Sequence, residues 1–291
     1  MSVDYQILLE KYNLLCEENE NLKEEIMHLR SILTPSVGQV SNVSEAPKGN
    51  GINKRSSPED KIALFRSLFK GREDVFARRW YSKTTDKSGY QPVCENEWDE
   101  KMCDKKMYKC SSCPNRKLVA LTDKDIYKHL SGKDLYGRDV IGIYPMLQDE
   151  TCCFLCADFD EENYRRDVIA FKSTCTELNV PAYIERSRSG NGAHVWIFFS
   201  EHVSVRTARR LGSGILTRAM ERANISFKSY DRLFPNQDTM PKGGFGNLIA
   251  LPLQGMARKN SNSLFVDEHF IPYPDQWAFL SEVKRLSCEN A

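Results

Sequence analysis

The strongest constraint on the fold is a pair of apolar runs that carry polar residues at one end. The first run, residues 152–157, leads directly into Asp158-Phe159-Asp160, and the second, residues 195–199, follows His194. Side chains at positions i and i+2 of a β-strand point to the same face. If the first run is a strand, Asp158 and Asp160 share a face and can hold divalent cations between them.

A glycine-rich turn comes just before the second run. Its two glycines allow a positive φ and a close approach of the backbone to an anion. Two arginines, a serine and a histidine surround it. The candidate phosphate-binding residues here are Arg186, Arg188, Ser189, Gly190, Asn191, Gly192 and His194. Together with the two aspartates, this turn predicts metal-assisted chemistry on a nucleoside triphosphate.

A third acidic residue is needed if two cations are held, and residues 229–238 offer two candidates. Asp231 follows an aromatic approach and precedes an arginine, which favours it as a ligand, whereas Asp238 lies in sequence typical of a turn. Lys242 opens a second glycine-rich stretch and adds a positive charge. The predicted cation site is therefore Asp158, Asp160 and Asp231, occupied by Mg²⁺ or Mn²⁺.

The order of predicted elements indicates the fold class. We expect strands at 139–145, 152–158, 182–184 and 195–199, and amphipathic helices at 164–178 and 204–223. An earlier helix begins at Ser57-Pro58, where a capping serine precedes a proline at the first helical position. This order predicts an α+β domain and not a doubly wound Rossmann sheet.

Four cysteines in a lysine-rich stretch indicate a metal site. They are spaced C-x8-C-x6-C-x2-C and comprise Cys94, Cys103, Cys110 and Cys113. Four thiolates suit a tetrahedral structural Zn²⁺, which supplies folding energy that a polar sequence lacks. The alternative is a set of ordinary reduced cysteines. We expect the three cysteines between 152 and 156 to be buried strand residues instead.

The N-terminal residues show a heptad pattern. Leucine recurs every seven residues from Leu8 to Leu29, and Asn19 is the one polar residue at the companion positions. This pattern predicts a coiled coil at 1–33 that forms a homodimer or binds a partner protein. The alternative is an amphipathic helix packed on its own domain. Residues 34–57, rich in Pro, Gly, Ser and Asn, read as a flexible linker, which leaves 58–291 as the catalytic domain with the cysteine module at 94–113.

Charge and hydropathy indicate which partners and which cellular location to expect. The net charge is +1, yet residues 183–259 hold twelve Lys or Arg against five Asp or Glu, as a polyphosphate or nucleic-acid groove needs. Scattered surface arginines are the alternative explanation of that excess. With neither an apolar run of membrane-spanning length nor a signal-peptide pattern in the sequence, we expect a cytoplasmic protein without membrane contact.

The D-x-D pair leaves several functions open. It is compatible with a nucleotidyltransferase, a metal-dependent nuclease or a sugar-nucleotide transferase, because each uses carboxylates to bind cations that bridge phosphates. It is also compatible with carboxylates that merely cap a strand, in a non-enzymatic nucleic-acid adaptor. The sequence contains no G-x-x-x-x-G-K-[ST], which argues against a P-loop ATPase.

The order of the motifs resembles that of the archaeo-eukaryotic primase superfamily: D-x-D, then a serine and a histidine in a glycine-rich turn, then a lone aspartate. More narrowly, ERSRSGNGAHVW at 185–196 and YDRLFPNQD at 230–238 resemble the primase domain of TOTE conflict systems. The likeness runs from about residue 65 through 277 and includes the four cysteines. Ser189 lies five residues before His194, farther than in the common S-x-H.

The resemblance implies an RRM-like sheet with helices and a template-directed DNA primase/polymerase. Asp158, Asp160 and Asp231 would bind two catalytic metals, and the glycine turn with His194 would hold the triphosphate of an NTP or dNTP. Four cations would neutralise template or triphosphate, namely Arg186, Arg188, Lys242 and Arg258. The expected partners are a single-stranded or primed template, and a helicase and nuclease to which such modules are joined; these would be separate proteins, or this chain is a fragment.

Overall fold

The computed structural model describes residues 11, 51–160, 163–223 and 228–290. Residues 50–291 form one compact unit. The predicted coiled coil at 1–33 and most of the predicted linker lie outside the described residues.

The unit begins with a helix that starts at the predicted cap. In α2 (Pro58–Leu68), Ser57 Oγ accepts a hydrogen bond from the backbone N–H of Asp60 at 3.0 Å, and Phe65 is fully buried. A second helix, α3 (Asp123–Ser131), begins with a capping box formed by Thr122 and Asp125. These caps satisfy backbone N–H groups that the first turn of a helix leaves unpaired.

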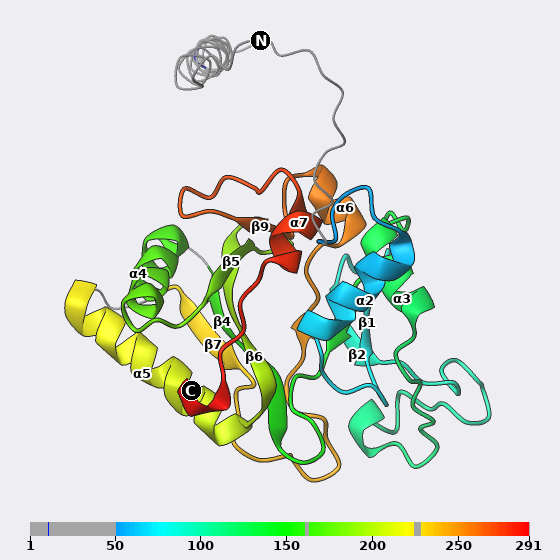
Figure 1. Cartoon of the computed structure of the whole chain (residues 1–291). Coiled ribbons are helices and arrows are strands. Elements are labelled where there is room, and N and C mark those ends of the chain that lie inside the picture. The colour runs from blue at the N-terminus through cyan, green and yellow to red at the C-terminus, as the bar shows by residue number, and fades with distance from the viewer. Residues whose placement is uncertain (1–10, 12–50, 161–162, 224–227, 291) are drawn as a thin grey trace. The chain divides into compact units, whose positions relative to one another are not determined.

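Two antiparallel sheets form the body (Figure 1). The first has the order β2-β1-β3-β8 and contains β1 (Ala77–Tyr81), β2 (Ser88–Pro92), β3 (Ile141–Ile143) and β8 (Ile249–Ala250). The second has the order β7-β4-β6-β5-β9 and contains β4 (Thr151–Asp160), β5 (Tyr183–Arg186), β6 (Gly192–Ser204), β7 (Tyr230–Phe234) and β9 (Leu264–Val266). The predicted α+β class is confirmed, since the chain mixes helices with antiparallel sheets.

The predicted strands on either side of residue 147 belong to different sheets. β3 pairs with β1 and β8, whereas β4 pairs with β6 and β7. A tight turn joins them, in which the N–H of Leu147 donates to the carbonyl of Thr151 at 2.8 Å. The chain therefore crosses from one sheet to the other just before the strand that carries the aspartates.

Both faces of the five-stranded sheet are covered. On one face, α4 (Tyr164–Glu177) and α5 (Val205–Ala223) pack against side chains that include Leu155 and Val195 (Figure 1). On the other face, Phe154 and Trp196 pack with α2 and with strand residues of the first sheet. Asp158 has the same strand parity as Phe154 and therefore faces the side on which the first sheet lies.

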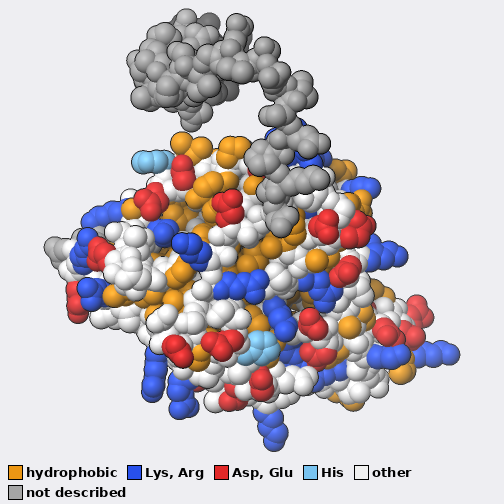
Figure 2. Space-filling view, viewed as in Figure 1, with side chains coloured by type: hydrophobic (Ala, Val, Ile, Leu, Met, Phe, Trp, Pro, Cys, Tyr) orange, Lys and Arg blue, Asp and Glu red, His pale blue; other side chains and the backbone are white. Residues whose placement is uncertain are grey.

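Short elements complete the unit. They are α6 (Gly255–Lys259), α7 (Gln276–Ser281) and two 3₁₀ turns, η1 (Cys110–Ser112) and η2 (Cys288–Asn290). The expectation for the cysteines of β4 is confirmed, because Cys152, Cys153 and Cys156 are all buried. Figure 2 shows basic and acidic side chains interspersed on the face drawn there. Within the described ranges, none of the helices has the length and apolarity needed to cross a membrane.

Candidate active site

Three carboxylates meet at the end of β4. One carboxylate oxygen from each of Asp158, Asp160 and Asp231 lies within 4.8 Å of the other two. Asp158 and Asp160 come from β4, and Asp231 comes from the neighbouring strand β7. The alternation along β4 places the first two on one face, and strand pairing brings in the third.

A β-bulge in β7 explains how Asp231 reaches this face. Asp158 pairs with Arg232 and Phe159 pairs with Tyr230, so Asp231 is the extra residue between two paired ones. In a regular ladder Asp231 would lie opposite Phe159 and share its buried face. A bulge re-aims the side chain of the inserted residue, and here it turns Asp231 toward the other two carboxylates.

Asp158 is the buried member of the group. Only 8% of its surface is exposed, and its Oδ1 is buried without a hydrogen-bond partner. The nearest cation is His194, whose Nε2 lies 3.4 Å from that oxygen, an ion-pair distance without hydrogen-bond geometry. The pKa of Asp158 is raised to about 6, chiefly by burial and also by the negative charges of Asp160 and Asp231, against the opposing effect of His194.

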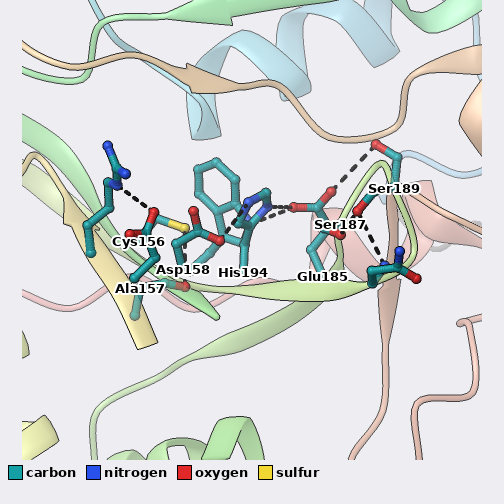
Figure 3. A network of polar contacts seen from close by, with 12 residues as sticks. Cys156, Ala157, Asp158, Glu185, Ser187, Ser189 and His194 are labelled. Carbon is teal, nitrogen blue, oxygen red and sulfur yellow. Dashed lines mark hydrogen bonds and ion pairs between the residues drawn. The ribbon is translucent and has the colours of Figure 1, made fainter. Parts of the chain in front are cut away.

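His194 is held from its other side by a residue that the sequence analysis left out. Its Nδ1 lies 2.6 Å from Oε2 of Glu185, which also accepts a hydrogen bond from the indole Nε1 of Trp196 at 3.1 Å. Glu185 is 1% exposed and lies on β5 directly across from His194. Figure 3 shows the imidazole between Asp158 and Glu185.

This arrangement keeps His194 protonated. Burial alone lowers the pKa of an imidazole, but the carboxylates of Glu185 and Asp158 outweigh that effect and raise the pKa of His194 to about 9. With Nδ1–H donated to Glu185, the Nε2–H side faces Asp158 and the open end of β4. A protonated imidazole in this position can donate to an anion bound beside the three carboxylates.

The glycine turn joins β5 to β6 with two different demands on its glycines. Gly190 has φ +84°, in the region that favours glycine, and the phenol of Tyr164 donates to its carbonyl at 3.3 Å. Gly192 instead begins β6 opposite Asp160, where an added Cβ would lie 2.3 Å from Oδ1 of that residue. The prediction of a positive φ therefore holds for Gly190, while Gly192 serves the close approach of two strands.

Ser189 and Asn191 make hydrogen bonds inside the turn. Ser189 Oγ lies 3.0 Å from Ser187 Oγ and accepts from the N–H of Asn191 at 3.3 Å. Both Ser189 and Asn191 are exposed. The hydroxyl of Ser189 thus shapes the turn, and a contact with triphosphate stays a prediction.

The four predicted cations lie in separate places. Arg186 shares the helix-covered face of the sheet and donates to the carbonyls of Ser261 and Phe270, at 2.9 and 2.6 Å. Its alternation on β5 with Glu185 sends it away from the carboxylates, and a contact of Arg186 with phosphate stays a prediction. Arg258 likewise donates to the carbonyl of Leu130 at 2.6 Å, anchoring α6 to α3.

The other two predicted cations are Arg188 and Lys242. Arg188 lies close to Arg79 and Tyr90 on the first sheet, where its charge acts on both side chains. Lys242 is exposed in a loop and has no contact with the three carboxylates in the described part of the chain. Asp238 forms an ion pair with Arg209 on α5, in agreement with the preference for Asp231 as a ligand.

Two further residues support the carboxylates. Arg232, paired with Asp158 in the ladder, forms an ion pair with Asp231 at 2.6 Å and offsets part of the negative charge. Asp167 on α4 is buried and accepts from the hydroxyl of Ser229 at 2.7 Å, while the carbonyl of Ser229 accepts from the N–H of Asp160 at 2.7 Å. This chain of contacts fixes the start of β7 relative to the end of β4.

The three carboxylates suit hard divalent cations. Carboxylate oxygens are the ligands that Mg²⁺ and Mn²⁺ prefer, and like charges this close repel one another without a counter-ion. The orphaned Oδ1 of Asp158 is a buried acceptor in need of a partner. The site therefore fits a divalent metal on the evidence of its own donor set.

The four predicted zinc ligands line a small cavity of about 30 Å³ between β2 and residue 118. The N–H of Lys117 lies 3.2 Å from Sγ of Cys94. Burial raises the pKa of Cys110, and the neighbouring Cys103 and Cys113 add to the rise. Among the described residues, no three of these sulfurs approach one another as closely as the three carboxylates do.

Comparison with known proteins gives the family of this chain. The family model described as the archaeo-eukaryotic primase domain of the TOTE conflict system matches residues 60–291. A search of curated proteins gave no match. Among solved structures, the polymerase domain of Mycobacterium tuberculosis ligase D in complex with DNA aligns with a TM-score of 0.40 and 12% identity, over 80% of this chain and 86% of that one.

Proposed function

Because the chain belongs to the archaeo-eukaryotic primase domain family of TOTE conflict systems, we propose that it is a template-directed nucleotidyltransferase of the primase/polymerase type. The observation that carries the proposal is the meeting of Asp158, Asp160 and Asp231 within 4.8 Å beside a protonated histidine. Carboxylates that hold cations, next to a donor for phosphate oxygens, are what transfer of a nucleotide requires.

The proposed reaction joins two nucleotides. The 3′-hydroxyl oxygen of a primer, or of an initiating nucleotide, attacks the α-phosphorus of a bound NTP or dNTP and forms a phosphodiester bond. The bond from that phosphorus to the bridging oxygen breaks, pyrophosphate leaves, and the hydroxyl proton passes to solvent. Two divalent cations, when bound by the three aspartates, would stabilise the attacking and the leaving oxygen.

The protein's own groups would position the triphosphate. His194 donates from Nε2 to a phosphate oxygen, and Glu185 fixes the ring by accepting from Nδ1 at 2.6 Å. The guanidinium of Arg188 in the glycine turn would add positive charge, while the N–H groups of Gly190 and Asn191 already donate within the turn. Lys242, in a loop, is a further cation that we assign to substrate phosphates.

Gel-resolved products test this proposal. Labelled rNTPs or dNTPs are supplied with Mg²⁺ or Mn²⁺ on a single-stranded template, with and without a primer. The wild-type chain extends or initiates a strand, and Asp158→Asn abolishes incorporation while leaving the fold intact. Asp238→Asn is the matched control, because it makes the same chemical change outside the three carboxylates.

Two outcomes would contradict the proposal. The first is a lack of incorporation with every template, either sugar and either metal. The second is cleavage of the template without added nucleotides, which would identify a nuclease that uses the same carboxylates.

We also keep the structural zinc as a proposal. The cavity shared by Cys94, Cys103, Cys110 and Cys113 supports it, and Zn²⁺ would draw the sulfurs together into a closed tetrahedral site. Elemental analysis should give one zinc per chain. Replacement of Cys110 and Cys113 by serine should lower that content and the thermal stability together.

The expected partners follow from the same proposal. We expect a single-stranded or primed nucleic-acid template as the main binding partner, and a helicase and a nuclease as partner proteins. Association through residues 1–33 gives a homodimer or a complex with another protein. Light scattering on the full chain tests the homodimer, since Leu15→Asp with Leu22→Asp should reduce its molar mass to that of a monomer.

A further inference from the structure

An open groove of about 900 Å³ lies on the unit apart from the three carboxylates. Its floor is the hairpin of β1 and β2, which extends beyond β3 because β3 pairs with β1 only at residues 77 and 78. Its walls are α3 and the residues 133–139. The groove therefore follows from the unequal strand lengths of the four-stranded sheet.

Basic side chains dominate the lining of the groove. The six cations that line it are Arg78, Arg79, Lys124, Lys128, Lys133 and Arg138. Lys124 and Lys128 lie one turn apart on the same face of α3 and are exposed.

The acidic side chains of the lining are already engaged. Glu97 pairs with Lys105 at 2.9 Å, Asp134 pairs with Arg138 at 2.8 Å, and Asp139 accepts from the amide of Gln254 at 2.9 Å. By contrast, four cations have no ion pair with any residue of the described chain. They are Arg79, Lys124, Lys128 and Lys133. The groove therefore presents uncompensated positive charge.

Exposed aromatic rings alternate with these cations. Tyr127 is 49% exposed and lies between Lys124 and Lys128 on α3. Trp80 is 37% exposed, and its ring lies over Gly89, where an added Cβ would come within 3.0 Å of the indole. The ring is thus seated on bare backbone, with part of its surface open to the groove.

The groove adjoins the glycine turn through Arg79. This side chain lies close to Arg188, and burial together with the nearby positive charge of Arg188 lowers the pKa of Arg79. The positive charge of Arg188 thus lies next to Arg79, one of the residues that line the groove.

We propose that this groove binds single-stranded nucleic acid, with phosphates on its lysines and arginines and unpaired bases on Tyr127 and Trp80. Cations that track a backbone, interleaved with aromatic rings that stack on bases, are the chemistry that recognises a single strand. A duplex would engage the cations but conceal its base faces. The identification of this strand as the template rests on the proposed function; the binding itself does not.

Fluorescence anisotropy with a labelled oligodeoxythymidylate tests the groove in the full chain. Substitution of Lys124, Lys128 and Lys133 by alanine should weaken binding at least tenfold. It should also flatten the logarithmic dependence of affinity on salt by about 2, since each phosphate contact on a single strand contributes about 0.7.

The matched control removes the same number of charges from the opposite side of the five-stranded sheet. Arg206, Arg210 and Arg218 are exposed on α5, and their replacement by alanine should change affinity and salt dependence less than twofold. An equal loss in both triple variants would overturn the proposal, because it would show a non-specific charge effect.

The aromatic rings test whether the bound strand is single. Trp80→Ala combined with Tyr127→Ala should weaken binding about tenfold or more and leave the salt dependence unchanged. Unchanged affinity in this variant, or equal affinity of the wild type for duplex, would overturn the single-strand assignment. Asp158→Asn should bind the oligonucleotide like the wild type, so a failure of the groove and a failure of nucleotide transfer give different results.

Discussion

At the scale of single residues, the candidate site stores unfavourable electrostatics around Asp158. Its carboxylate is buried, has one unpaired oxygen, and lies beside two other carboxylates. Burying a charge is costly unless it is paired. A bound divalent cation would neutralise the repulsion among these carboxylates. In the metal-free protein we therefore expect the buried charge of Asp158 to lower the free energy of unfolding.

Asp158→Asn should therefore stabilise the metal-free protein. At pH 8 the carboxylate is ionised in both the folded and the unfolded chain, because its pKa is about 6 when folded and 3.8 in the reference state. The upward shift of the pKa means that ionised Asp158 lowers the free energy of unfolding. One pKa unit corresponds to roughly 1.4 kcal/mol, and because the folded protein relaxes around the charge we expect a total effect of about 2 kcal/mol.

Urea unfolding at pH 8 with a chelator measures this effect. Asp238→Asn, which removes a carboxylate paired with Arg209, is the comparison and should not stabilise. A destabilised Asp158→Asn would show that the carboxylate is satisfied in the folded protein.

Glu185 is a positioning residue for His194. Glu185→Gln should lower the rate of nucleotide incorporation about 10- to 100-fold, since a hydrogen bond to a charged group contributes roughly 1.5–3 kcal/mol. The combination with His194→Asn should lose little more than His194→Asn alone, because both act through one imidazole.

Steady-state kinetics of the two single variants and the double variant measure this coupling. Thermal unfolding serves as the control, because Glu185 is buried. If the rate losses of the two single variants were additive in the double variant, Glu185 would not act through the imidazole and its role would be purely structural.

At the scale of elements, the buried His129 connects helix α3 to strand β3 and to the segment at Pro252. The imidazole of His129 on α3 accepts from the N–H of Ile141 through Nδ1 at 3.1 Å and donates from Nε2 to the carbonyl of Pro252 at 2.9 Å. The contact with Ile141 requires the neutral ring, because a protonated Nδ1 cannot accept a hydrogen bond, and burial lowers the pKa of His129 to about 4. The connection between α3 and β3 is thus sensitive to acid.

Stability should consequently fall as the pH decreases from 6.5 to 4. In that window the unfolded chain binds a proton at this position and the folded chain does not, so the free energy of unfolding rises with pH. The contribution amounts to about 3 kcal/mol at roughly 1.4 kcal/mol per pH unit.

Unfolding of the wild type and His129→Gln across this range isolates the term, since other groups contribute equally to both. His269→Gln, at an exposed position, is the control. Parallel pH profiles for the wild type and His129→Gln would contradict the neutral-ring assignment.

The elements also show what sequence can and cannot provide. The apolar runs before Asp158 and after His194 were sufficient to predict β4 and β6, because burial selects long apolar strands. The bulge at Asp231 was not predictable, since it depends on how β7 pairs with β4. The preference for Asp231 over Asp238 as a metal ligand came from the residues next to Asp231 in the sequence.

The two β5 residues before the turn illustrate a signal that could have been used. In a hairpin closed between Ser187 and Gly192, Glu185 faces His194 and Arg186 faces the opposite side. An acidic residue within an otherwise apolar strand was therefore a candidate partner for the histidine. The sequence does not give the register between β5 and β6. Arg186 therefore became the candidate for phosphate binding, because it lies close to the glycine turn in the sequence.

At the scale of the whole unit, strand parity sorts the functional groups. The helices α4 and α5 cover one face of the five-stranded sheet, and the carboxylates, His194 and Glu185 lie on the other. The basic groove belongs to the first sheet, and its lining residue Arg79 lies close to Arg188 of the glycine turn. The groups that we propose for catalysis and for binding the strand thus come from different sheets.

Divalent metal should stabilise the unit as a whole. At about one hundred times its dissociation constant, Mn²⁺ adds roughly 2.7 kcal/mol to the free energy of unfolding, which corresponds to a rise of about 5–10 °C in Tm. Asp231→Asn should lose most of that rise, because it removes one of the three ligands. Differential scanning calorimetry with and without Mn²⁺ measures it, and an equal rise in Asp231→Asn would place the metal elsewhere.

The central claim is that the three carboxylates transfer nucleotides under the direction of a template. Its most direct test supplies one nucleoside triphosphate at a time on four primed templates that differ in the next base, and measures incorporation together with released pyrophosphate. We predict one pyrophosphate per added nucleotide, incorporation of the complementary nucleotide alone, and loss of both signals in Asp160→Asn. Incorporation that ignores the template base, or that persists in Asp160→Asn, would contradict the account.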